Sequence, residues 1–179
     1  MQAPILILGA SGKIGGAIAK SIAKTNTVIL QGNRNKSSLK ILCKKIGNKC
    51  LGVFSADLSN EIEAKRIFEE IENKYKKLSG IIFSIATPFP HKLSFRTKWN
   101  IFNEQIETQI KAFHFSVTSA IPLLEKNKKA RILVVSTEYV LGEPPTKIAP
   151  YVVAKSALTS YAKILSQEII SKGIKVHIM

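Results

Sequence analysis

The sequence predicts an α/β fold in which a doubly wound parallel sheet lies between two layers of helices. Three observations carry this prediction. Strand-like and helix-like segments alternate along the chain, two strand-like segments are apolar throughout, and no linker or repeat interrupts the order. Strands covered on both faces read as continuous apolar runs. The alternation implies right-handed crossovers between parallel strands, as in three-layer Rossmann-like sheets.

The elements follow one another in a regular order. The first strand is an apolar run, and the helical pattern AIAKSIAK follows it after a glycine-rich turn. The fourth and fifth strands lie in SGIIFSIA and ARILVVS, which are apolar enough for a sheet covered on both faces. The expected strands are Ile5–Leu8, Thr27–Gln31, Cys50–Ser55, Gly80–Ile85, Arg131–Ser136 and Lys175–Met179. The expected helices are Lys13–Lys24, Ser37–Lys45, Asn60–Lys76, Asn100–Glu125 and Tyr151–Ser171.

Length and composition are typical of one compact domain over residues 1–179. A chain of 179 residues with 45% hydrophobic residues can bury a full core. No segment is long and apolar enough to cross a membrane, so no membrane partner is expected. Because Met1 leads directly into the first expected strand, we expect no signal peptide and take the cytoplasm as the default location.

The two cysteines, Cys43 and Cys50, lie within or beside elements that are expected to be buried. No further cysteine or histidine stands near them at the spacing of a metal site, and two cysteines do not make a disulfide framework. We therefore expect free thiols at both positions and no metal site.

The formal net charge of +15 raises the question of nucleic-acid binding, because a basic surface attracts phosphate backbones. The lysines, however, are scattered over several segments, and no basic run carries interleaved aromatic residues. Solvated helix ends account for most of them, so we expect no specific nucleic-acid partner. One asymmetry remains: nine basic residues and no acidic residue precede Asp57.

Polar and small residues stand at the ends of the expected strands, where doubly wound sheets bind their ligands. The stretch Gly9–Gly16 joins the first strand to the first helix. Such a turn lets the backbone approach a pyrophosphate, and the helix N-terminus offers free N–H groups to the anion. The sequence therefore predicts dinucleotide binding. The segments at strand ends are Gly9–Gly15, Arg34, Asp57, Ser84–Thr87 and Ser136–Thr137.

Tyr151 and Lys155 lie in the run PYVVAKSAL, at the start of the last expected helix. Residues four apart on a helix project from the same face, so the ammonium can sit beside the phenol. A phenol with a reference pKa near 10 is a poor acid at neutral pH, and a nearby cation stabilises its phenolate. Tyr151 is therefore the candidate general acid.

With these motifs the sequence resembles the short-chain dehydrogenase/reductase family over nearly the whole chain. GASGKIG resembles the family's cofactor turn, and YVVAK matches its Tyr-x-x-x-Lys motif. Gln109, thirteen residues before Pro122, occupies the place of the catalytic Asn, and Thr137 that of the substrate-binding Ser. The resemblance implies catalytic roles for Tyr151, Lys155, Thr137 and Gln109. It implies cofactor contacts for Gly9, Ser11, Gly12, Lys13, Ile14, Gly15, Asp57, Leu58, Ala86 and Lys155.

The sequence departs from the family pattern at several positions. Phe83–Thr87 stands where the family carries Asn-Asn-Ala-Gly, and only Ala86 is kept. Ser136 competes with Thr137 for the substrate hydroxyl role, because the loop to Tyr151 is one residue longer than usual. Gln109 would place its amide differently from an Asn. The chain stops after the sixth expected strand, before the segment that covers the nicotinamide in the family, so we expect a truncated member.

The cofactor is expected to be NADP(H) rather than NAD(H). An enzyme that selects NAD places an Asp or Glu about twenty residues past the glycine turn. Here that position reads Gln31-Gly32-Asn33-Arg34, without a carboxylate. Arg34, and with it Lys13 or Lys36, can pair with a 2′-phosphate, Arg through two hydrogen bonds at once.

Two functions from different classes follow. The first is an NADP-dependent oxidoreductase that reduces a ketone or oxidises an alcohol, with Tyr151 as proton donor. The alternative is a nucleotide-binding sensor or scaffold with little turnover. Pro88–Trp99 is expected to line the substrate pocket, with Phe89, Phe95 and Trp99 as apolar walls. The partner is a small carbonyl or alcohol substrate, and the resemblance implies a homo-oligomer formed through the last two expected helices.

Overall fold

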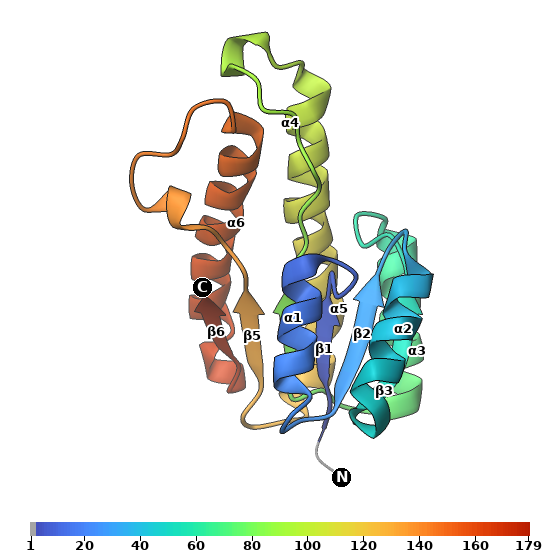
Figure 1. Ribbon diagram of the computed structural model, residues 1–179. Helices are drawn as coiled ribbons and strands as arrows, with labels where there is room; N and C mark the ends of the chain where they lie inside the picture. The colour runs from blue at the N-terminus through green and yellow to red at the C-terminus, as the bar shows by residue number, and fades with distance from the viewer. Residues whose placement is uncertain (1–2) are drawn as a thin grey trace.

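The predicted doubly wound sheet is confirmed in a computed structural model that describes residues 3–179 (Figure 1). Six parallel strands are arranged in the order β3-β2-β1-β4-β5-β6. The strands are β1 (Ile5–Leu8), β2 (Val28–Gly32), β3 (Cys50–Ser55), β4 (Gly80–Phe83), β5 (Arg131–Val134) and β6 (Lys175–Ile178). The helices are α1 (Lys13–Ile22), α2 (Lys36–Ile46), α3 (Glu61–Tyr75), α4 (Trp99–Ile106), α5 (Ala112–Glu125) and α6 (Ala149–Glu168).

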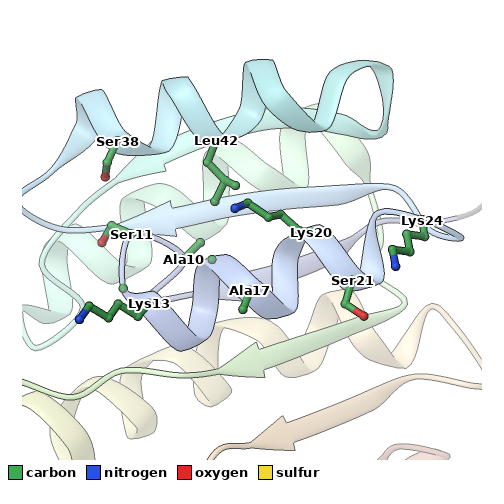
Figure 2. A pocket seen from close by; sticks show the side chains of 11 residues that line it. Ala10, Ser11, Lys13, Ala17, Lys20, Ser21, Lys24, Ser38 and Leu42 are labelled. Atoms are coloured by element: carbon green, nitrogen blue, oxygen red, sulfur yellow. The ribbon is translucent and has the colours of Figure 1, made fainter.

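Two separate cores explain why the central strands are apolar at every position. Leu6 and Leu8 of β1 pack into the core under α3, α5 and α6. Ile7 points to the opposite face and packs into the core under α1 and α2. In Figure 1, α1 lies in front of the sheet and α5 behind it. On the front face, residues of α1 and α2 line a shared groove (Figure 2).

The expected helix Asn100–Glu125 is not one regular helix. α4 and α5 are joined by a π-helical turn, Glu107–Lys111, which adds one residue to the helical turn. The last helix begins at Ala149, two residues earlier than expected, with Pro150 in its first turn, where proline is favoured. Shorter elements are the 3-10 turns η1 (Gly47–Lys49), η2 (Ser94–Arg96), η4 (Glu138–Val140) and η5 (Ile170–Lys172).

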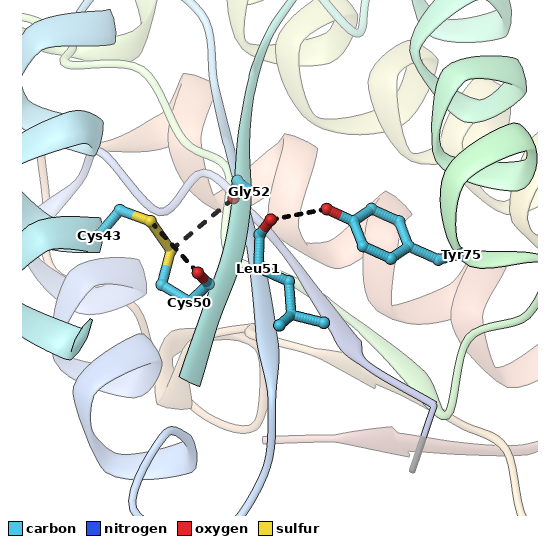
Figure 3. Close-up of a disulfide and its surroundings, with 5 residues drawn as sticks. All are labelled: Cys43, Cys50, Leu51, Gly52 and Tyr75. Atoms are coloured by element: carbon cyan, nitrogen blue, oxygen red, sulfur yellow. Dashed lines mark hydrogen bonds between the residues drawn. A yellow bond between two sulfur atoms is a disulfide. The ribbon is translucent and has the colours of Figure 1, made fainter. Parts of the chain in front are cut away.

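The expectation of free thiols is wrong, because Cys43 and Cys50 form a disulfide (Figure 3). α2 ends at Ile46, and Gly47, with φ of +74°, turns the chain back into β3. This short connection brings the two Cα atoms to 5.3 Å. A hydroxyl from α3 also reaches β3, since Tyr75 donates a hydrogen bond to the Leu51 carbonyl at 2.8 Å.

Within residues 3–179, no helix combines the length and the apolar character that a membrane crossing requires.

Candidate active site and cofactor cleft

The turn between β1 and α1 is shaped by two glycines that admit no side chain. Gly9 has φ of +80°, and a Cβ there would lie 2.6 Å from the Ser84 carbonyl oxygen. A Cβ on Gly15 would lie 2.3 Å from the Gly9 carbonyl oxygen. The backbone of the turn therefore stays bare at the start of α1, and this cradle suits the pyrophosphate that the sequence predicts.

A cleft of about 290 Å³ lies at the carboxyl ends of the strands. It brings together seven of the residues predicted to bind the cofactor: Gly9, Ser11, Gly12, Arg34, Asp57, Leu58 and Ala86. The other three residues of the glycine turn that were predicted to bind the cofactor lie outside this cleft. Lys13 lines the neighbouring groove between α1 and α2, Ile14 is 59% exposed, and Gly15 is buried beneath the turn.

Gln31, at the end of β2, is a buried residue of the cleft whose role the sequence did not reveal. Its Oε1 accepts a hydrogen bond from the Gly9 N–H at 3.2 Å, and its Nε2 donates to the Ala56 carbonyl at 2.9 Å. The amide is therefore occupied in linking the glycine turn to the end of β3. This leaves Arg34, which is exposed in the cleft wall, as the charged group at the end of β2.

Asp57 follows β3 and carries a negative charge at neutral pH. Burial raises its pKa, but hydrogen bonds from Ser59 and Asn33 and the charge of Arg34 outweigh this effect, so the pKa lies below its usual value. The carboxylate accepts from the Ser59 backbone N–H at 2.9 Å and from its hydroxyl at 2.7 Å. Asp57 is thus fixed in the cleft wall by the turn that begins α3.

Tyr151 and Lys155 lie one turn apart on α6, as predicted. Lys155 is 3% exposed and donates a hydrogen bond from Nζ to the Val135 carbonyl at 2.7 Å. Its Nζ lies 5.9 Å from the centroid of the Tyr151 ring. Burial lowers the pKa of Lys155 to about 8, because the ammonium has lost most of its water and no carboxylate compensates.

Phe89 covers the Tyr151 ring from the loop after β4. The two rings are stacked, with centroids 5.0 Å apart and planes inclined by 17°. The His91 ring stacks in turn on Phe89, with ring centroids 5.4 Å apart. The expectation that Phe95 and Trp99 form pocket walls is not met, because they are 78% and 70% exposed.

Gln109 lies in the π-helical turn and is fully buried. Its Nε2 donates to Oε1 of Gln105 at 2.9 Å, while its own Oε1 has no hydrogen-bond partner. Gln105, also fully buried, donates to the Thr87 carbonyl at 3.1 Å. Gln105 was not predicted from the sequence. The only signal was its four-residue spacing from Gln109, which places both amides on one face of a helix.

Ser136 and Thr137 have different surroundings at the end of β5. The Ser136 hydroxyl shares a hydrogen bond of 2.6 Å with Thr159 of α6. The Thr137 hydroxyl accepts from the Tyr139 N–H at 3.5 Å and keeps its own proton free to donate. Both residues line a cavity of about 380 Å³ together with Leu141 and Met179, apart from the cofactor cleft. Tyr151 lines neither cavity.

Comparison with known proteins identifies relatives along the whole described chain. A family model described as short chain dehydrogenase matches residues 3–179. A 3-oxoacyl-[acyl-carrier-protein] reductase, FabG, of Rickettsia felis is 30% identical over 172 residues, which are 96% of this chain and 68% of that protein. A 3beta-hydroxysteroid dehydrogenase of Mediterraneibacter gnavus is 25% identical over 174 residues, which are 95% of this chain and 62% of that protein.

Two solved structures share the fold. A short-chain dehydrogenase from Streptomyces avermitilis superposes with a TM-score of 0.88 at 18% identity, and the match covers 99% of this chain and 65% of that one. An NADH-dependent reductase complexed with NAD superposes with the same TM-score of 0.88 at 17% identity, and the match covers 99% of this chain and 77% of that one. The chain spans only part of each of these four proteins, and just under two thirds of the Streptomyces structure.

Proposed function

Since the chain belongs to the short-chain dehydrogenase/reductase family, we propose that it is an NADP(H)-dependent oxidoreductase that reduces a ketone or oxidises an alcohol. The observation that carries this proposal is the pairing of Tyr151 with Lys155 on one face of α6. The ammonium is buried, is held at the end of β5 by the Val135 carbonyl, and lies beside the phenol ring. A buried cation beside a phenol is the arrangement that proton transfer by Tyr needs.

The residues of the chain divide the work around the cofactor. The nicotinamide, when bound, supplies the hydride chemistry. Tyr151 gives a proton to the oxygen of the developing alkoxide, and Lys155 stabilises the phenolate and holds the ribose hydroxyls. We assign to Thr137 the hydrogen bond to the substrate carbonyl, since its hydroxyl accepts from a backbone N–H and keeps its own proton, whereas the Ser136 hydroxyl keeps its proton only where Thr159 is the donor of their shared hydrogen bond.

Gln109 supports a water relay to Lys155 in this proposal. Its Oε1 is buried without a partner, and a buried acceptor of this kind is expected to bind an ordered water. Gln105 acts as a positioning residue, because it fixes the Gln109 amide and ties the π-helical turn to the loop that carries Thr87. The π-helical turn itself is of the kind often found at functional sites.

The choice of NADP(H) rests on the end of β2. Gln31 uses both ends of its amide inside the protein, and the residues that follow it, Gly32, Asn33 and Arg34, offer no carboxylate to the ribose hydroxyls. Arg34 lines the cleft and can bind a 2′-phosphate through two hydrogen bonds. Ser11, on the facing turn, offers a hydroxyl to the same phosphate.

A second function remains a candidate, that of a nucleotide-binding sensor with little turnover. It is favoured by the Phe89 ring on Tyr151, which covers the proposed proton donor. Assaying NADPH oxidation with a broad panel of ketones and aldehydes, beside a titration of NADPH binding, separates the two functions. Turnover supports the enzyme. Tight NADPH binding with no turnover on any carbonyl supports the sensor.

The remaining parts of the proposal concern the location of the protein, its substrate and its oligomeric state. We place the protein in the cytoplasm, acting on a small carbonyl or alcohol, as a homo-oligomer formed through α5 and α6. His114 and Tyr161 share a hydrogen bond of 2.7 Å across these two helices and present a joint surface there. In a reducing cytoplasm the Cys43–Cys50 disulfide would be opened, and the fold must then be stable without it.

A further inference from the structure

The layer formed by α1 and α2 carries an unbalanced positive charge. The first 56 residues contain no Asp or Glu, and their basic residues are Lys13, Lys20, Lys24, Arg34, Lys36, Lys40, Lys44, Lys45 and Lys49. All of these side chains are exposed except that of Lys49, which is half-buried. Within residues 3–179, the four salt bridges join residues from Arg66 onward, so none involves this layer.

Three of these lysines line a groove of about 500 Å³ between α1 and α2. In Figure 2, Lys13 lies at the N-terminal end of α1, Lys20 in its last turn, and Lys24 just beyond its C-terminal end. At 1.5 Å per residue the row extends over about 16 Å. The groove also offers the hydroxyls of Ser11, Ser21 and Ser38. The groove therefore presents an extended row of donors with no acidic residue in its lining.

The shape and lining of the groove select its ligand. A row of cations about 16 Å long matches a chain of phosphates better than one small anion. No aromatic side chain lines the groove, so stacking on bases is absent and the backbone alone can be recognised. The lining offers no large exposed apolar side chain that could insert into a bilayer, since Leu42 is buried.

We infer that this groove binds the phosphate backbone of a nucleic-acid strand without reading its sequence. The groove shares only Ser11 and Gly12 with the cofactor cleft, whereas Lys20 and Lys24 belong to the groove alone. Binding of a strand is therefore separable from binding of the cofactor, and the inference does not depend on the proposed enzymatic activity.

The test measures binding of two unrelated fluorescent 20-nucleotide RNA strands by anisotropy over a range of salt concentrations. The variant Lys20→Gln/Lys24→Gln should lower the slope of log affinity against log salt by about 1.4, or about 0.7 for each phosphate that the variant no longer neutralises. If the variant and the parent protein bind the strand equally at 1 M salt, this difference in slope makes the variant bind about 25-fold more weakly at 0.1 M salt. Both strands should respond equally.

The matched control is Lys128→Gln/Lys129→Gln, which removes two exposed lysines from the loop before β5. This control should bind the strands nearly as tightly as the parent protein. An equal loss in both variants would mean that net charge alone acts, and would overturn the inference. Overturning results are also no strand binding by the parent protein, binding only to phosphatidylserine vesicles, or complete displacement of the strand by NADPH. Circular dichroism melts verify that both variants fold.

Discussion

Phe89 lies face to face with Tyr151, its ring centroid 5.0 Å away and its plane inclined by 17°. The two residues come from distant parts of the chain, the loop after β4 and the first turn of α6. A second contact between the two loops at this edge, from the Lys92 N–H to the Lys147 carbonyl at 3.1 Å, supports this arrangement. The loop after β4 thereby orients the proposed proton donor.

Replacing Phe89 with Ala should lower turnover about fivefold and leave NADPH affinity unchanged. An aromatic pair contributes about 1 kcal/mol, and a Tyr151 ring that is free to rotate loses part of its geometry for proton transfer. Steady-state kinetics and an NADPH titration measure both quantities. Phe95→Ala is the control, because Phe95 lies in the same loop but is 78% exposed. The orienting role fails if the two variants behave alike.

Activity should decline as the pH rises through about 8, the pKa to which burial lowers Lys155. Above that pH the side chain loses the charge that stabilises the phenolate and holds the cofactor. A profile of turnover and NADPH affinity from pH 6 to 10 checks this. Turnover that stays constant through pH 8 and 9 would show that the charge of Lys155 is not used.

The same group links stability to pH. In the unfolded chain Lys155 keeps its proton up to about 10.5, whereas in the folded protein it loses it at about 8. The unfolded state binds more protons between these values, so the free energy of unfolding gains a term that rises with pH. Relative to Lys155→Met, the parent protein should become more stable from pH 8 to 10. Urea unfolding at several pH values measures the difference.

NADPH should bind at least about tenfold more tightly than NADH, a difference of about 1.4 kcal/mol. Arg34→Ala should remove most of this difference without weakening NADH, because only the 2′-phosphate distinguishes the cofactors. Lys40→Ala is the control, since Lys40 is exposed on α2 and lies outside the cleft. Fluorescence titrations decide the matter. A preference for NADPH that survives in Arg34→Ala would mean that another residue, such as Lys13, binds the phosphate.

Opening the Cys43–Cys50 disulfide should lower the free energy of unfolding by about 2.5 kcal/mol, the loop-closure value for so short a loop. Unfolding by urea with and without dithiothreitol measures the loss. In Cys43→Ser/Cys50→Ser the reductant should have no effect. Equal stability of the parent protein in both conditions would mean that the bond contributes nothing to the free energy of unfolding.

The parts of this molecule that were predictable are those encoded within short stretches of sequence. The apolar runs of β1, β4 and β5 indicated a sheet covered on both faces, and the glycine turn indicated the start of a cofactor cleft. Tyr151 and Lys155 needed only their spacing on a helix.

The parts that escaped prediction depend on contacts between distant segments. Nothing in the sequence shows that Gln31 spans from Gly9 to Ala56, or that Gln105 reaches Thr87. The disulfide escaped because the turn after α2, not the cysteine spacing alone, brings the two sulfurs together. The π-helical turn escaped because its single extra residue leaves the helical pattern intact over Asn100–Glu125.

The most direct test of the central claim compares NADPH oxidation by the parent protein and by Tyr151→Phe on the best carbonyl of the panel. Phe keeps the ring and its stack on Phe89 but removes the proton donor. We predict that turnover falls at least about 100-fold, the scale of general acid catalysis, while NADPH affinity stays within about twofold. Equal turnover in the two proteins would contradict the account.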